Sequence, residues 1–237
     1  MILKFLSTTF AILCLSLSAF GQQEATVVPV QFRATLLDPI KPTATLFYTH
    51  KTGAVVPLNF RPQDLTAALW TLPVNGSLVL YDRADIDPLN PTVGIAASIK
   101  LPAGLKQAIV VVLPSPADSK PAYKLLVIDD SLKAFPPGES RVVPLLNVET
   151  AIQAGEHRLQ IQSGKITTVP PVKKVNEFMM AQTNFYYQQA GSWVPFTERQ
   201  LQYLDDYRRI FLVYATPGAV QPSVTTIVDT VTSMPPK

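Results

Sequence analysis

The sequence is poor in the residues that most often carry covalent and metal chemistry. Among 237 residues there is one cysteine, Cys14, and there are two histidines, His50 and His157. Cys14 lies in an N-terminal apolar stretch that we expect to be cleaved off, so the mature chain would have neither a disulfide nor a thiol nucleophile. The folded chain must then be held together by its apolar core.

Charge is also scarce. Only 16% of the residues are charged, and the formal net charge of +3 at pH 7 becomes 3 − 1 = +2 without Lys4. There is no basic stripe, so nothing favours a nucleic-acid partner. With 47% hydrophobic residues, the chain falls well outside the disordered class.

The motifs of the common enzyme classes are missing. We find no G-x-S-x-G, no H-E-x-x-H, no P-loop and no dinucleotide-binding fingerprint. Asp82, Asp85 and Asp87 are oxygen ligands of the type that calcium prefers, but their spacing departs from the EF-hand rule, and calcium binding stays open. We therefore predict a protein that is not an enzyme, with no catalytic, cofactor-binding or metal-ligating residues.

The N-terminal segment has the plan of a secretory signal peptide. An apolar stretch follows Lys4, and small residues stand at Ala19 and Gly21. The stretch is short for a membrane span, which needs about 20 apolar residues, and no later run is long enough. We predict a signal peptide at residues 1–21 and export to the periplasm, the outer envelope surface or the extracellular space.

Proline is abundant and separates short apolar runs. There are 22 prolines, about twice the usual share of about 5%. The runs between them are rich in β-branched residues and partly alternate, which favours strands over helices. We expect strands over residues 28–37, 43–50, 53–60, 76–82, 92–102, 107–114, 123–130, 139–149, 157–164, 165–172, 176–189, 193–196 and 208–215. Residues 61–70 are either a helix capped by Asp64 or a strand ending at Trp70.

Three segments carry more specific predictions. A proline inside 139–149 indicates an edge strand or two short strands. We expect 157–164 to pair with 165–172 as a hairpin. A longer hairpin should join 176–189 to 193–196, with Phe185 and Tyr187 on one face and Trp193 across from them.

The segment "DDYRRIFLVYATP" combines charges with an apolar run. Both faces of its strand are apolar, which predicts a central strand buried on both sides or at a domain contact. We interpret Asp205, Asp206, Arg208 and Arg209 as charges at the rim of the sheet, where they either pair with each other or mark the end of the strand, and not as a catalytic cluster.

About 14 short strands predict an all-β fold. They suit two Ig-like β-sandwich domains, or one extended two-sheet sandwich. We place the first domain at residues 22–132 and the second at 133–237, because "DDSLKAFPPGE" has the composition of a linker. No convincing internal repeat is visible in the sequence.

Three runs carry a resemblance to known proteins: "LPVNGSLVLYDR", "YKLLVIDDSLKAFPPGESRVVPLLN" and "RRIFLVYATPGAVQPSVTTIVD". With them the chain resembles a set of uncharacterised exported β-sandwich proteins of bacterial envelopes. The F-P-x-G-S motif of that set appears here between Phe135 and Ser140 with a second proline and Glu139 inserted. The resemblance implies the fold and export, and it implies no activity.

Three hypotheses for function follow. The first is a non-catalytic envelope protein that binds an envelope protein or a cell-surface polysaccharide, or that is part of an assembly. The second is a periplasmic chaperone-like protein that adds a partner's strand to an exposed edge, with Arg33 gripping the partner's carboxylate. The third is a carbohydrate-binding or carbohydrate-active protein. Tyr186, Tyr187 and Trp193, together with Arg33, are the candidate ligand or partner surface.

Overall fold

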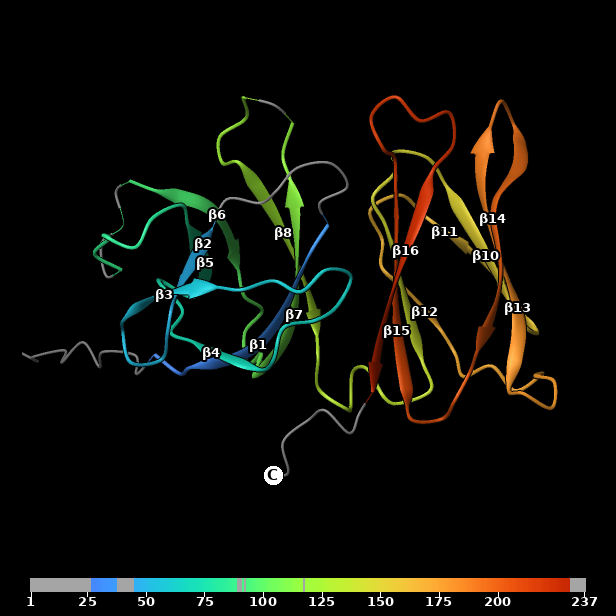
Figure 1. The fold of residues 1–237 in the computed structure, drawn as a ribbon, viewed down its shortest axis with the longest axis horizontal. Coiled ribbons are helices and arrows are strands. Elements are labelled where there is room, and N and C mark those ends of the chain that lie inside the picture. Colours follow the sequence, from blue (N-terminus) through green and yellow to red (C-terminus); the bar gives the residue numbers. More distant parts are fainter. Residues whose placement is uncertain (1–26, 38–44, 89–90, 92, 117, 231–237) are drawn as a thin grey trace, which may run out of the picture.

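A computed structural model describes residues 27–37, 45–88, 91, 93–116 and 118–230 of the chain. The predicted signal peptide and Cys14 lie outside these residues. Within them the protein contains 16 strands and no helix, so the prediction of an all-β fold is confirmed. The strands form four sheets of four strands each, arranged as two pairs (Figure 1).

The first pair of sheets contains the first eight strands. One sheet has the order β4-β1-β7-β8 and the other β3-β2-β5-β6. The strands are β1 (Val30–Leu36), β2 (Leu46–Thr49), β3 (Val55–Leu58), β4 (Leu69–Thr71), β5 (Ser77–Tyr81), β6 (Ile95–Lys100), β7 (Gln107–Pro114) and β8 (Tyr123–Asp129).

The second pair contains the remaining eight strands, in the orders β12-β9-β15-β16 and β11-β10-β13-β14. Its strands are β9 (Ser140–Pro144), β10 (Thr150–Ala154), β11 (His157–Ile161), β12 (Thr167–Val169), β13 (Met180–Gln189), β14 (Ser192–Gln202), β15 (Tyr207–Tyr214) and β16 (Ser223–Thr230). The last strand of the first pair and the first strand of the second lie on either side of the boundary predicted at 132/133.

The two sandwiches repeat one topology. Counted from its own first strand, each has one sheet in the order 4-1-7-8 and one in the order 3-2-5-6. In each, the first strand runs parallel to the seventh, as β1 does to β7 and β9 to β15. The sequence gives no sign of this repeat, because the two halves share a pattern of strands and not a pattern of residues.

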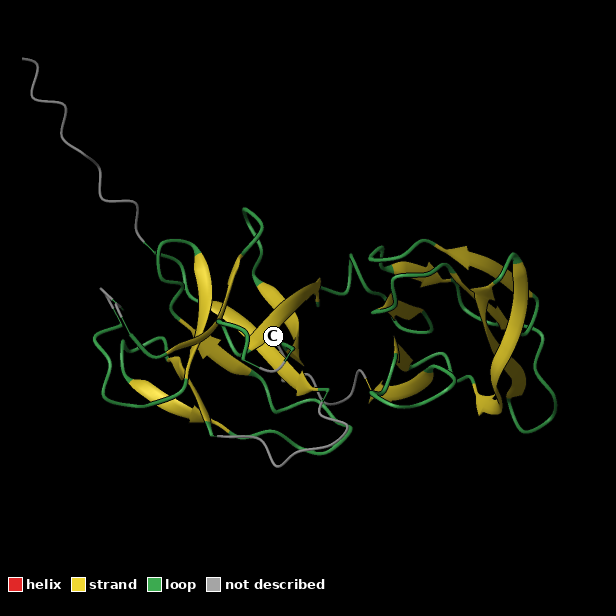
Figure 2. Ribbon diagram, turned by 90° about the horizontal axis from the view of Figure 1, so that it is seen from above, coloured by secondary structure: helices red, strands yellow, loops and turns green. Residues whose placement is uncertain are grey.

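Three apolar layers hold the four sheets together. Phe32 and Val110 belong to the core of the first sandwich, and Phe185 and Phe211 to that of the second. A third buried layer lies between β4-β1-β7-β8 and β12-β9-β15-β16. It contains Leu37, Leu65, Ile109, Val111, Ile128, Phe135, Val143, Ile210, Leu212 and Ile227. The two sandwiches therefore pack sheet against sheet. Figure 1 shows them side by side, and Figure 2 shows the same arrangement from above.

This stacking explains why β15 is apolar on both faces. Ile210 and Leu212 point into the layer between the sandwiches, whereas Phe211 and Val213 point into the core of the second sandwich. The prediction of a strand buried on both sides is confirmed. β7 has the same double burial, with Ile109 and Val110 on opposite faces.

The placement of the charges before β15 at the rim of the sheet is wrong for the arginines. Arg208 is fully buried inside β15, and Arg209 is buried beside it. Arg209 stacks on the rings of Tyr203 and Tyr207, at 4.6 and 5.5 Å from their centroids. Only Asp205 and Asp206 are exposed.

The structure corrects three further expectations. β11 pairs with β10, and β12 pairs with β9 in the other sheet, so residues 157–172 are not a hairpin. β9 is an internal strand, and its proline is tolerated because it stands at the strand's last residue. In 61–70 the helix is wrong, because the only regular element reaching this segment is the strand β4.

The hairpin of β13 and β14 forms, but with another register. Ala190 and Gly191 both have positive φ, 49° and 82°, as a two-residue hairpin turn requires. This turn sets Gln188 opposite Trp193 and Val194 opposite Tyr187. Trp193 therefore faces outward, and the inner partner of Tyr187 is Phe196, whose ring centroid lies 5.7 Å away.

One carboxylate fixes the segment that leads from β12 to β13. Glu156, in the turn between β10 and β11, accepts hydrogen bonds from the backbone N–H groups of Lys173 and Lys174 at 2.8 and 3.0 Å. Burial alone would raise the pKa of Glu156, but these backbone hydrogen bonds lower it to about 2. A lowered pKa means that the charged form stabilises the fold above the ordinary carboxyl pKa of 4.5 and that this contribution disappears as the pH falls toward 2.

We expect Glu156→Gln to lower the free energy of unfolding at pH 7 by about 1.5 kcal/mol, the lower end of the usual contribution of hydrogen bonds to a charged group. Urea titrations of the wild type and the variant between pH 7 and pH 2 would measure this difference. It should shrink on acidification, and a difference that stays constant with pH would contradict the role given to the charge.

Candidate functional site

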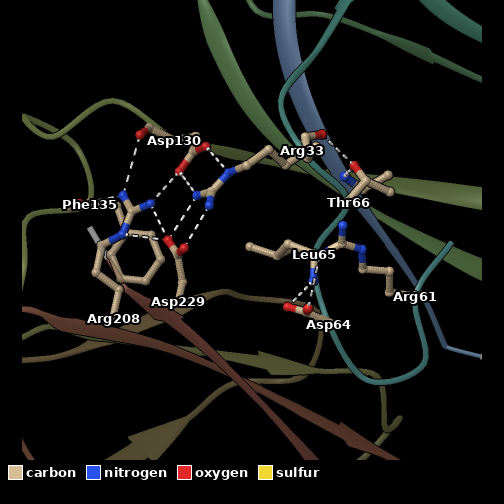
Figure 3. Close-up of polar contacts among 11 residues, drawn as sticks. Arg33, Arg61, Asp64, Leu65, Thr66, Asp130, Phe135, Arg208 and Asp229 are labelled. Carbon is tan, nitrogen blue, oxygen red and sulfur yellow. Dashed lines mark hydrogen bonds and ion pairs between the residues drawn. The ribbon is translucent and has the colours of Figure 1, made fainter. Parts of the chain in front are cut away.

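A buried cluster of four charges lies between the sandwiches (Figure 3). Arg33 comes from β1, Asp130 directly follows β8, Arg208 lies on β15 and Asp229 on β16. All four side chains are buried, with Arg208 fully inaccessible. Asp130 and Asp229 stand at the corresponding end of the eighth strand of each sandwich.

Each carboxylate of this cluster binds one arginine from each sandwich. Arg33 donates to Asp130 at 2.8 and 2.9 Å and to Asp229 at 2.6 and 2.8 Å. Arg208 donates to Asp130 Oδ1 at 2.8 Å and also to Asp229. The cluster thus ties the sandwiches together by two ion pairs that cross between them.

The remaining contacts of Arg208 complete its coordination. Its Nη1 donates to the carbonyl oxygen of Phe135 at 2.9 Å, and its guanidinium lies 4.7 Å from the centre of the Phe135 ring. Arg141 lies 4.6 Å from the same ring. The linker residue Phe135 therefore contacts two cations, and its ring is itself fully buried.

The pairing shifts the pKa values of Asp229 and Arg33. Burial alone would raise the pKa of Asp229, but the hydrogen bonds and charges of Arg33 and Arg208 more than offset it and hold the pKa below its ordinary value of 3.8. Burial alone would likewise lower the pKa of Arg33, and the two aspartates raise it instead. Arg33 and Asp229 are therefore both charged at neutral pH.

This cluster is suited to holding the sandwiches together and not to binding a partner. Each carboxylate forms ion pairs with both guanidinium groups, and the Arg33 side chain points into the layer between the sandwiches. The structure thus places Arg33 away from any exposed strand edge, although the sequence suggested it as a grip for a partner's carboxylate.

A second feature lies on the outer face of the sheet β11-β10-β13-β14. A hollow of about 530 Å³ opens there. It is lined by Ala151, Ile152, Gln153, Arg158, Leu159, Gln160, Tyr186 and Trp193. Its volume falls within the range of small-molecule sites, about 300–1,000 Å³.

The hollow arises from a small residue between large ones. Ala151 of the internal strand β10 pairs with Gln160 on one side and with Tyr186 on the other. All three side chains point to the same face, because directly paired residues of neighbouring strands do so. The methyl group of Ala151 leaves a depression that the longer side chains of Gln160 and Tyr186 enclose.

The aromatic residues singled out from the sequence divide between this hollow and the core. Tyr186 and Trp193 line the hollow together. Tyr187 points inward and is buried, and its hydroxyl donates to Gln189 at 3.0 Å. Tyr186 and Tyr187 are consecutive in one strand, so their side chains point to opposite faces of the sheet. The sequence showed this alternation but not which of the two faces is exposed.

Gln153, Arg158 and Gln160 were not singled out from the sequence. They lie on β10 and β11 and line the hollow opposite the aromatic rings. Isolated polar residues of a strand look like any solvent-facing side chains, so the sequence held no signal for them. A neighbouring hollow of about 520 Å³, lined by Lys165 and Thr167 among others, shares Gln160 with the first.

Comparisons of the sequence with protein-family models and with curated proteins found no match. The described residues include no helix that is long and apolar enough to cross a bilayer. They also include no group of three or more histidine, cysteine, aspartate or glutamate side chains placed to hold a metal ion, and Asp82 is instead paired with Arg83 at 2.9 Å.

Proposed function

We propose that this protein is a non-catalytic exported envelope protein that binds cell-surface polysaccharide on the outer face of β11-β10-β13-β14. The observation that carries the proposal is the hollow in which Tyr186 and Trp193 lie opposite the amides of Gln153 and Gln160. Aromatic rings offer flat apolar faces to the C–H surface of a sugar, and amides donate to and accept from its hydroxyl groups. The signal-like N-terminus supports export.

The position of the hollow favours a polysaccharide over an added strand. It lies over β10 and β13, which are internal strands of their sheet. Their backbone N–H and C=O groups are already paired with neighbouring strands, so a peptide laid across this face cannot extend the sheet as strand addition requires. A sugar chain carries its own hydroxyl donors and acceptors and needs only side chains.

A chaperone-like assembly protein is the second candidate function. The long edge strand β14, with 11 residues, supports it. Arg33 pairs inward with Asp130 and Asp229, which weighs against the hypothesis that it binds a partner's carboxylate. A pull-down from envelope extract with mass spectrometry separates the two, because one stoichiometric protein partner would favour assembly.

We expect Tyr186→Ala and Trp193→Ala each to weaken binding to polysaccharide extracted from the producing cells about tenfold, or about 1.4 kcal/mol. Each change removes a ring that lines the hollow. Co-sedimentation of the purified protein with insoluble polysaccharide would measure it. Trp70→Ala is the matched control, because Trp70 is 39% exposed but belongs to the other sandwich. Equal binding by all three variants would contradict the proposed surface.

A further inference from the structure

We infer that the polysaccharide bound in the hollow is acidic, with a carboxylate-bearing sugar held by Arg158. This inference rests on the proposed function and adds the class of ligand to it. Arg158 is exposed and is the one cation that lines the hollow, and no described carboxylate lines it. The residues that line this hollow therefore carry a net charge of +1, whereas the neighbouring hollow is lined by both Glu149 and Lys165.

Arg158 is also available for a ligand. Its partner across the strands is Gln153, whose side chain is neutral, and among the described residues none forms an ion pair with it. The other arginines of the second sandwich that we have discussed, Arg141, Arg208 and Arg209, are buried and engaged with aromatic rings. A guanidinium presents a planar pair of donors that fits a carboxylate in two parallel hydrogen bonds.

The spacing of the groups indicates a chain of sugars and not a single sugar. Arg158 and Tyr186 stand on strands separated by one strand, and their paired positions on β10 are two residues apart, at Gln153 and Ala151. With about 4.8 Å between strands and about 3.4 Å per residue, their Cα atoms lie about 12 Å apart. Trp193 lies one strand further on the far side of Tyr186. The hollow thus crosses all four strands obliquely, with the aromatic rings at one end and the cation at the other.

The test compares two polymers on the purified protein: alginate, a polymer of uronic acids, and dextran, a neutral glucan. Isothermal titration calorimetry would measure both affinities at 50 and 500 mM NaCl. We expect alginate to bind at least tenfold more tightly than dextran at low salt and to lose most of this advantage at high salt. Arg158→Gln should reduce alginate binding about tenfold and so remove most of the preference for alginate over dextran.

The matched control is Arg61→Gln, which removes the same charge from an exposed position in the other sandwich. An equal loss of alginate binding in both variants would show general attraction to a cationic protein and would overturn the inference. Equal affinity for both polymers, abolished by Tyr186→Ala, would overturn the acidic ligand but leave the proposed function standing. No binding of either polymer, combined with no retention on polysaccharide from the producing cells, would overturn both.

Discussion

Replacing Asp229 by asparagine is expected to lower the free energy of unfolding by about 3–5 kcal/mol, the usual effect of removing one partner from a buried ion pair. Asp229 is 4% exposed and accepts hydrogen bonds from both Arg33 and Arg208. The neutral amide would leave two buried guanidinium groups with one carboxylate between them. Urea unfolding followed by far-UV circular dichroism would measure the loss.

The matched control is Asp205→Asn, on the turn before β15. The Asp205 side chain is 85% exposed and pairs with Lys173 at 3.0 Å. Its replacement should change stability by less than about 1 kcal/mol, because exposed ion pairs contribute little. A loss as small for Asp229→Asn as for Asp205→Asn would contradict the role of the cluster.

The loss caused by Asp229→Asn should depend on pH in one direction. The pKa of Asp229 is held below its ordinary value of 3.8 in the folded protein. The charged carboxylate therefore stabilises the fold above that pH, and the contribution disappears as the pH falls through the lowered pKa. The difference between wild type and variant should be largest at neutral pH and should shrink below about pH 4.

Replacing Phe135 by alanine is the second change with a large expected effect, a loss of about 3–5 kcal/mol. The ring is fully buried in the layer between the sandwiches and contacts the guanidinium groups of Arg141 and Arg208. Truncation would create a cavity and would remove the ring face from both cations. Phe135→Leu should lose less, because it keeps most of the buried apolar volume.

The control for Phe135→Ala is Phe178→Ala, since Phe178 is 66% exposed and its truncation should be nearly neutral. The protein also offers a probe in each sandwich, because its two tryptophans are Trp70 in the first and Trp193 in the second. Fluorescence of the Trp70→Phe and Trp193→Phe backgrounds would follow each sandwich in urea. Phe135→Ala should move both transitions, and movement of only one would show that the layer does not couple them.

The strand content of this protein is readable from the sequence for a local reason. Alternation in residues such as Leu159 and Ile161, and β-branched runs such as that of β7, express the period of a strand within a few residues. The burial of both faces of β15 could also be predicted from the sequence, because neither face carries a charged residue after Arg209. These features require no knowledge of which strands are neighbours.

The pairing of the strands depends on contacts between distant residues. β11 and β12 are adjacent in sequence but belong to different sheets, and no local pattern marks that change. The repeated topology of the two sandwiches is hidden for the same reason. The outward direction of Trp193 depended on the register set by the turn at Ala190 and Gly191.

The sequence by itself determined an all-β chain, the strand-rich segments, the scarcity of catalytic and metal-binding residue types, and Tyr186 and Trp193 as candidates for a surface. Only the tertiary structure decided that Arg33 and Arg208 face Asp130 and Asp229, which come from 97 and 21 residues away in the chain. It also decided that Arg158, Ala151 and Tyr186 share one hollow. The physical reason is that the sequence does not show whether a charged residue is solvated or buried. That depends on neighbouring strands that are distant in the sequence and that only the fold brings together.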